Sequence, residues 1–303
     1  MSWLRPALNT YLRWTEKPKL RRATPEEARR SFLQKSRIFF HAPRGIQRDI
    51  VPFGPGEALT LAPRGHRSGP VLLYFHGGGF VFGAPETHAA MLAALAQRVG
   101  ALAVLPRYPL APEHPFPAAL DHALASYHAC RAAYPDRPVL IGGDSAGGAL
   151  SLSLLARLIA SDAPLPAGVF AFSPLTDLTF SAPSFQTNAE AEVVLPAERA
   201  AEMVQMYLRD TDPRDPDVSP LFGDFTGAPS VWITVADTEI LYDDSRRMAA
   251  HLRAQGVDVA FVQEHDLPHV WPIFHNVLPE ARATLDQLSG WIKAQTAASA
   301  PTR

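Results

Sequence analysis

Short apolar runs separated by helix-length stretches recur through most of this chain of 303 residues. We expect the apolar runs to be strands, at residues 71–75, 101–105, 139–141, 169–172, 231–235 and 257–262. The stretches that we expect to be helices are residues 88–99, 117–133, 147–160, 241–255 and 280–293. Because neighbouring parallel strands are joined by long crossovers, this alternation predicts an α/β fold, a mainly parallel twisted sheet with helices on both faces.

Two regions interrupt that alternation. Residues 1–45 carry apolar side chains at helical spacing, followed by Pro25-Glu26-Glu27 as a helix start. Residues 181–220 contain an amphipathic stretch that opens at Pro196. We expect both to form a small helical cap over the carboxyl ends of the strands, where open α/β sheets place their sites. Residues 46–180 and 221–303 would then form the α/β domain, and surface decoration is the alternative role for the two regions.

Composition excludes several classes of protein. Hydrophobic residues make up 47% and charged residues 19%, which is typical of a globular chain, and the net charge of −2 gives no broad basic field for nucleic acid. Cys130, the single cysteine, excludes an internal disulfide framework and favours a reducing compartment. We see neither a secretory h-region near the N-terminus nor 18 consecutive apolar residues, so we expect a soluble, cytoplasmic protein without stable membrane insertion.

A nucleophile is predicted at Ser145, in the run Gly143-Asp144-Ser145-Ala146-Gly147. The run follows a short apolar strand and precedes a helix, and a sharp strand-to-helix turn holds a serine hydroxyl exposed beside a base. Glycines two residues before and after the serine remove Cβ atoms that would clash across the turn. A phosphate-binding loop is the alternative, but its glycine spacing is missing.

An oxyanion loop is predicted upstream, where residues 71–75 lead into His76-Gly77-Gly78-Gly79-Phe80. Three consecutive glycines allow backbone N–H groups to approach a substrate, and each well-placed donor stabilises the transition state of acyl transfer by about 3–4 kcal/mol. We therefore expect the oxyanion hole to be formed by Gly77, Gly78, Gly79 and Ala146.

With these two motifs, and with the segment from Tyr108 to Asp121, the sequence resembles the hormone-sensitive-lipase family of bacterial carboxylesterases, the branch that carries GDSAG. The resemblance covers about residues 70–275. It implies an α/β-hydrolase fold with residues 46–180 and 221–303 as the catalytic domain, no cofactor or metal, hydrolysis of small-molecule esters with short to medium acyl chains, and a possible homodimer. It also implies that His76 shapes the oxyanion loop and is not the general base.

The acid and the base of a triad should follow the serine in that order. Asp237 lies just past the carboxyl end of the apolar run 231–235 and matches the family's acid, with Glu239, Asp243 and Asp244 as competitors. His269 matches the family's histidine, although Val270-Trp271 replaces its Gly-Phe. His265 is the weaker alternative. We therefore predict a catalytic triad of Ser145, Asp237 and His269, whose base must be neutral, so that activity falls below roughly pH 6–7.

Bulky apolar residues near these motifs are candidates for the acyl and alcohol pockets, although each is more often a core residue than a pocket residue. They are Phe80, Phe82, Tyr108, Phe172, Leu175, Met203, Tyr207, Val270 and Trp271. Bulky cap residues further suggest that only short chains fit. An amidase or a lactonase remains open within the enzyme class. A ligand receptor on the same scaffold, like the plant gibberellin receptor, would lack the catalytic histidine, which is present here.

Overall fold

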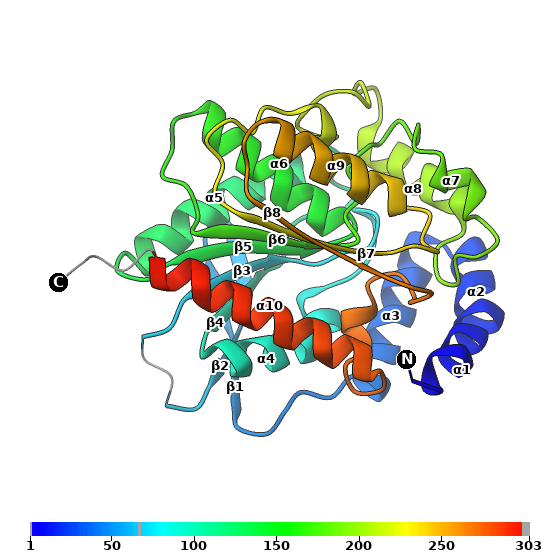
Figure 1. Cartoon of the computed structure of the whole chain (residues 1–303), viewed down its shortest axis with the longest axis horizontal. Coiled ribbons are helices and arrows are strands. Elements are labelled where there is room, and N and C mark those ends of the chain that lie inside the picture. The colour runs from blue at the N-terminus through cyan, green and yellow to red at the C-terminus, as the bar shows by residue number, and fades with distance from the viewer. Residues whose placement is uncertain (1, 66–67, 299–303) are drawn as a thin grey trace.

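The computed structural model describes residues 2–65 and 68–298, and its central element is an eight-stranded sheet (Figure 1). The strand order is β1-β2-β4-β3-β5-β6-β7-β8; β1 and β2 pair antiparallel, as do β2 and β4, and the pairs from β4 to β8 are parallel. The strands are β1 Ile46–Phe53, β2 Gly56–Pro63, β3 Val71–Phe75, β4 Leu102–Pro106, β5 Val139–Asp144, β6 Gly168–Phe172, β7 Val231–Ala236 and β8 Val259–Glu264. The predicted α/β class is confirmed.

Helices cover both faces of the sheet because the strands are apolar on both. On β3, Leu73 and Phe75 belong to the core beneath one helical layer, whereas Leu72 and Tyr74 belong to the core beneath the other. Figure 1 shows α4 and α10 on one face and α5, α6 and α9 on the opposite face. Their bounds are α4 Pro85–Val99, α5 Ala118–Ala133, α6 Ala146–Ala160, α9 Tyr242–Ala254 and α10 Pro279–Ala298.

The β1–β2 hairpin is an element that the apolar runs did not reveal. β1 lies at the edge of the sheet, and most of its residues are exposed, with Arg48 and Asp49 in mid-strand. An edge strand of this kind lacks the continuous apolar pattern of a strand buried on both faces. Backbone pairing with β2, which only the folded chain shows, defines it.

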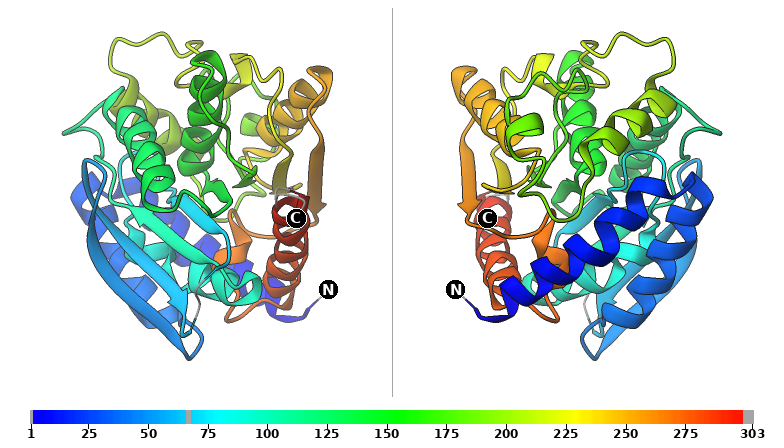
Figure 2. Two further views of the ribbon diagram at one scale, coloured as in Figure 1. Left: turned by 90° about the vertical axis from the view of Figure 1, so that its left-hand side faces the viewer. Right: turned by 90° about the vertical axis from the view of Figure 1, so that its right-hand side faces the viewer.

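The two interrupting regions fold into helices that contact each other at the carboxyl ends of the strands (Figures 1 and 2). We call these helices the cap. They are α1 Leu4–Tyr11, the π-helical η1 Leu12–Glu16, α2 Lys17–Arg22, α3 Pro25–Phe39, α7 Ser184–Thr187 and α8 Ala197–Leu208. A capping box between Thr24 and Glu27 starts α3. Lys17 Nζ donates to the carbonyls of Ala189 and Glu192, which fastens the first region to the second.

Short 3₁₀ segments, η2 Pro220–Phe222 and η3 Trp271–Phe274, complete the elements. Within residues 2–65 and 68–298, no helix has the length and apolar character that crossing a bilayer requires.

Candidate active site

Ser145 lies between β5 and α6 in a strained backbone conformation. Its φ is 52° and its ψ −121°, outside the regions that most side chains adopt. A Cβ on Gly147 would come within 2.1 Å of the Phe75 carbonyl oxygen, and one on Gly143 would come equally close to the Gly147 oxygen. Both glycines of the motif are therefore required by packing, and the turn that they allow presents Ser145 to a cavity.

His269 lines the same cavity and is held by a buried carboxylate. Its Nδ1 lies 2.6 Å from Glu239 Oε2. The other oxygen of Glu239 accepts hydrogen bonds from Ser173 Oγ at 2.9 Å and from the Ala236 backbone N–H at 2.7 Å. Since Nδ1 faces Glu239, Nε2 is the ring nitrogen that Glu239 does not engage.

The charge of the His269 ring is set by opposing effects. Burial alone would lower the pKa of His269, but the hydrogen bond with Glu239 and the negative charges of Glu239 and Glu192 outweigh burial and raise that pKa above its ordinary value of 6.5. The carboxylates therefore stabilise the imidazolium form of the ring.

Asp237 is turned away from this pair. Its Oδ2 lies 2.7 Å from Nδ1 of the exposed His265, and its Oδ1 accepts the Asp266 backbone N–H at 3.0 Å. Asp266 in turn binds Asn9 of α1. The sequence-based assignment of Asp237 as the acid that orients His269 is corrected by this geometry: Asp237 supports the loop on which α1 rests, and Glu239 contacts the histidine.

The predicted oxyanion loop lines the cavity beside Ser145, but the N–H of its first glycine already has a hydrogen-bond partner within the protein. The Gly77 N–H donates to Asp144 Oδ1 at 2.9 Å, so it is not free for a substrate. Gly78 and Gly79 have positive φ values of 124° and 59°, and within the described chain their N–H groups have no hydrogen-bond partner. Ala146 is the first residue of α6, where N–H groups lack helical partners. The available donors are thus those of Gly78, Gly79 and Ala146, and the inclusion of Gly77 is corrected.

Comparison with known proteins assigns the family. Residues 72–273 match the family model described as alpha/beta hydrolase fold. The chain belongs to the α/β-hydrolase family. This α/β-hydrolase is 35% identical over 249 residues to an acetyl-hydrolase of Streptomyces hygroscopicus, covering 82% of this chain and 83% of that one. It is 34% identical over 221 residues to an esterase of Acinetobacter venetianus, covering 72% and 73% respectively.

Solved structures agree with this assignment. A crystal structure described as an esterase from the bacterial hormone-sensitive lipase family superposes with a TM-score of 0.91 at 31% identity, over 98% of this chain and 99% of that one. The crystal structure of EstE5 soaked with p-nitrophenyl butyrate superposes with a TM-score of 0.91 at 32% identity, over 98% of this chain and 100% of that one. The predicted family resemblance is confirmed, and this α/β-hydrolase is a carboxylic ester hydrolase.

His76 and Tyr108 pack against each other at the start of the oxyanion loop. The His76 ring stacks on Tyr108 with centroids 4.5 Å apart, and the Tyr108 hydroxyl donates to the His76 carbonyl at 2.7 Å. Burial lowers the pKa of His76 to about 3, so this ring is neutral and packed. Tyr108 is buried in the core and does not line the cavity.

The cavity has a volume of about 430 Å³, within the range of small-molecule sites. Of the pocket candidates, Phe82, Leu175, Met203 and Val270 line it. Met203 of α8 stands over the oxyanion loop, since a Cβ on Gly79 would lie 3.2 Å from its sulfur. The remaining candidates are corrected to core positions: Phe80 and Tyr207, stacked 3.8 Å apart, Tyr108, Phe172, and Trp271, whose Nε1 donates to Thr284.

Sequence reasoning missed most of the apolar wall, which comes from the N-terminal helices. The missed cap residues that line the cavity include Leu8, Leu12, Leu20, Phe32, Phe39 and Phe40. Their helical spacing in residues 1–45 was the available signal. It indicated a helix but not which side of the helix would face Ser145.

Glu192 is a second buried carboxylate beside the histidine. Its oxygen, an oxygen of Glu239 and a nitrogen of His269 all lie within 4.8 Å of one another. The Glu192 carboxylate accepts the backbone N–H groups of Val194 and Leu195, and more distantly that of Ile240. Burial raises the pKa of Glu192, and the negative charge of Glu239 adds to that rise, although His269 opposes it. Because these atoms already have partners in the chain, we assign them to the histidine site and not to a metal.

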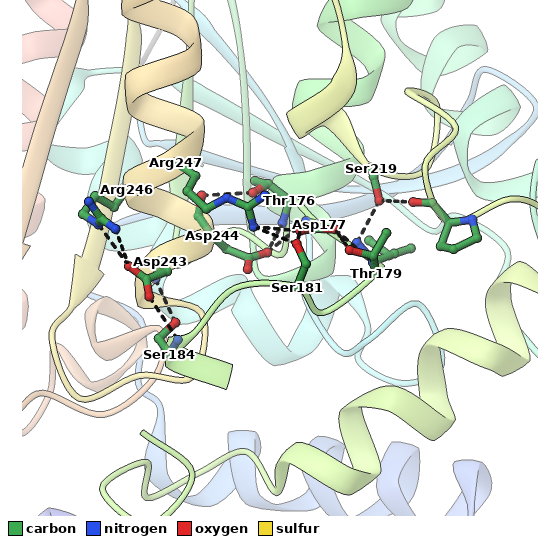
Figure 3. Close-up of polar contacts among 12 residues, drawn as sticks. Thr176, Asp177, Thr179, Ser181, Ser184, Ser219, Asp243, Asp244, Arg246 and Arg247 are labelled. Carbon is green, nitrogen blue, oxygen red and sulfur yellow. Dashed lines mark hydrogen bonds and ion pairs between the residues drawn. The ribbon is translucent and has the colours of Figure 1, made fainter. Parts of the chain in front are cut away.

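A polar cluster behind the cavity holds the loop that follows β6 (Figure 3). Asp244 Oδ2 in α9 accepts the backbone N–H groups of Thr176 and Asp177, at 2.8 and 2.9 Å, and Arg247 Nη1 lies 2.8 Å from Asp177 Oδ2. This loop begins with Ser173, which donates to Glu239. The cluster therefore fixes both the cavity wall at Leu175 and the support of the acid.

Proposed function

We propose that this hydrolase is a serine carboxylesterase that cleaves short- to medium-chain esters through an acyl-enzyme, with Ser145 as nucleophile, His269 as base and Glu239 as acid. The observation that carries the proposal is the buried 2.6 Å contact between His269 and Glu239 in the wall of the cavity that also holds Ser145. A histidine so held has one ring nitrogen free, a fixed tautomer and stabilisation of its charged form.

In the first half of the reaction, Ser145 Oγ forms a bond to the ester carbonyl carbon while its proton moves to His269. The oxyanion is stabilised by the N–H groups of Gly78, Gly79 and Ala146. His269 then gives the proton to the alcohol oxygen as the bond to that oxygen breaks, which leaves an acyl group on Ser145. Glu239 stays ionised and stabilises the imidazolium.

In the second half, His269 takes a proton from a water molecule whose oxygen attacks the acyl carbon. Ser145 leaves with the proton returned by His269, and a carboxylic acid is released. The apolar cavity, lined by Met203 of the cap and by Phe82 after the oxyanion loop, would hold the acyl chain.

The nucleophile is tested with a fluorophosphonate probe and mass spectrometry. We expect the label on Ser145 in the wild type and none in Ser145→Ala, and circular dichroism would verify that the variant is folded. A label on another serine would overturn the assignment. The chain-length range is tested with p-nitrophenyl esters from C2 to C16, for which we expect the highest kcat/KM between C4 and C8; fastest turnover of C16 would contradict it.

A further inference from the structure

Large apolar side chains are exposed on the outer side of the N-terminal helices. Trp3 is 81% exposed and Trp14 75%, and Tyr11, Ile38 and Phe39 are also exposed. The Tyr11 and Phe39 rings contact each other edge to face, with centroids 6.5 Å apart, which joins α1 to the end of α3. We call these five residues the cap patch. Exposed aromatic surface of this kind is unfavourable in water and marks a contact site.

The helical path explains how the patch arises. Tyr11 follows Trp3 by eight residues and Trp14 follows Tyr11 by three, so all three lie near one side of α1 and η1. The other side carries Leu8 and Leu12, which line the cavity. The apolar residues on the inner side of these helices therefore form part of the cavity wall. The exposed Trp3 and Trp14 on the outer side do not line the cavity within the described chain. Packing of the helix onto the protein requires only one apolar face, so it does not explain a second one.

Charge is distributed very unevenly between the first 45 residues and the rest of the chain. Residues 1–45 contain 11 Lys or Arg residues against 3 Glu, whereas residues 46–303 contain 17 Lys or Arg against 27 Asp or Glu. The exposed cations of the helices include Arg13, Lys19, Arg21, Arg22, Arg30 and Arg37. The chain as a whole is nearly neutral, but its N-terminal helices are strongly cationic.

The cap patch also borders the opening of the cavity. Tyr11 and Phe39 belong both to the patch and to the cavity lining, and Val277, which lines the cavity from the loop before α10, is 39% exposed. Lys19 is both exposed and part of the lining. Figure 2, on its right, shows α1 and α3 running along the outer surface of the molecule.

We propose that the cap patch docks on an anionic lipid surface, with α1 lying in the headgroup plane and the cavity opening facing the lipid. Trp and Tyr are the side chains that favour the bilayer interface, and neighbouring Lys and Arg bind anionic headgroups. A second copy fits less well, because the strongly cationic N-terminal helices of two copies would repel each other. The docking itself does not depend on the proposed catalytic function; only the delivery of an ester from the lipid to Ser145 does.

The experiment is flotation of the full-length protein with vesicles of phosphatidylcholine, either pure or mixed with phosphatidylglycerol. We expect at least about ten-fold tighter binding to the anionic vesicles at low salt, weakened by high salt. Trp3→Ser with Trp14→Ser should lower that binding by about ten-fold or more. The Trp emission of the wild type should shift to the blue on vesicles, because Trp3 and Trp14 are exposed, whereas Trp232 and Trp271 are already buried and Trp291 is half-buried.

The matched control is Ile50→Ser with Phe222→Ser, which removes two exposed apolar side chains outside the cap. It should bind vesicles as the wild type does. Both double variants should keep wild-type kcat/KM on a soluble short-chain ester, because none of the four residues lines the cavity. Equal binding by the Trp variant, no preference for anionic vesicles, or a dimer in light scattering that the Trp substitutions abolish would each overturn the proposal. Failure of Ser145 labelling would bear on the catalytic proposal alone.

Discussion

His269 lies beside two buried glutamates, and an aspartate that the sequence favoured lies nearby on another histidine. The turn after β7 determines which of these carboxylates reaches His269. The Glu239 N–H bonds the Ala236 carbonyl at 3.2 Å, and the Glu239 carboxylate accepts the Ala236 N–H, so the side chain folds back under the strand end. Asp237 leaves the strand in the outward direction. Two positions along the chain thus separate the buried Glu239 from the half-buried Asp237.

Replacing each carboxylic acid by its amide tests whether Glu239 or Asp237 is the acid that supports His269. Glu239→Gln should lower kcat about 10³- to 10⁴-fold with little change in KM, because the amide no longer stabilises the imidazolium or enforces the right tautomer. Asp237→Asn is the matched control and should stay within a few-fold of the wild type. Steady-state kinetics on a p-nitrophenyl ester measure both, and the opposite ranking would restore Asp237 as the acid.

The pH profile of kcat/KM reports the charge around His269. The base works when neutral, and its pKa is raised above 6.5, so we expect activity to fall as the pH drops through a value above 6.5. Negative charge on Glu192 contributes to that rise. Glu192→Gln should therefore lower the pH at which kcat/KM falls on the acid side of the profile. A fall at the wild-type pH would mean that Glu192 is protonated while the enzyme works.

At the scale of elements, the loop after β6 and helix α9 act as one unit. Asp244 is buried and joins them through two backbone N–H groups, and Arg247 neutralises Asp177 across the same junction. Desolvation by burial raises the pKa of Asp244 to about 7, with the Asp177 charge adding to the effect. The junction that supports Ser173 and Leu175 therefore contains a carboxyl that titrates near neutrality.

The raised pKa has a direct consequence for stability. The unfolded chain releases the Asp244 proton near pH 4 and the folded chain near pH 7, so this residue lowers the free energy of unfolding as the pH rises through that window. Asp244→Asn keeps an oxygen for the two N–H groups but cannot ionise. Urea unfolding at pH 5 and pH 8 should show a smaller loss of stability in the variant, whereas the exposed Asp210→Asn should behave like the wild type.

The whole molecule combines an acidic α/β body with cationic N-terminal helices, and the cavity lies where the two meet. Its wall takes residues from the first 40 positions, from the oxyanion loop, from α8 and from the segment around His269. Segments so distant in sequence meet only because parallel strands bring their carboxyl ends to one edge of the sheet. Access to Ser145 is therefore a property of the assembled cap and body.

The sequence alone determined what local chemistry dictates. Buried strands must be apolar on both faces, the Ser145 turn needs its glycines, and the order of serine, acid and histidine follows the strands, so these features could be predicted. Tertiary structure decided four other features: the edge strand β1, the contact of His269 with Glu239 and not with Asp237, the hydrogen bond of the Gly77 N–H to Asp144, and the side of α1 that faces the cavity. Each of these features depends on a contact between residues that are far apart in the sequence or that a turn of the chain orients differently. The local residue pattern does not specify such contacts.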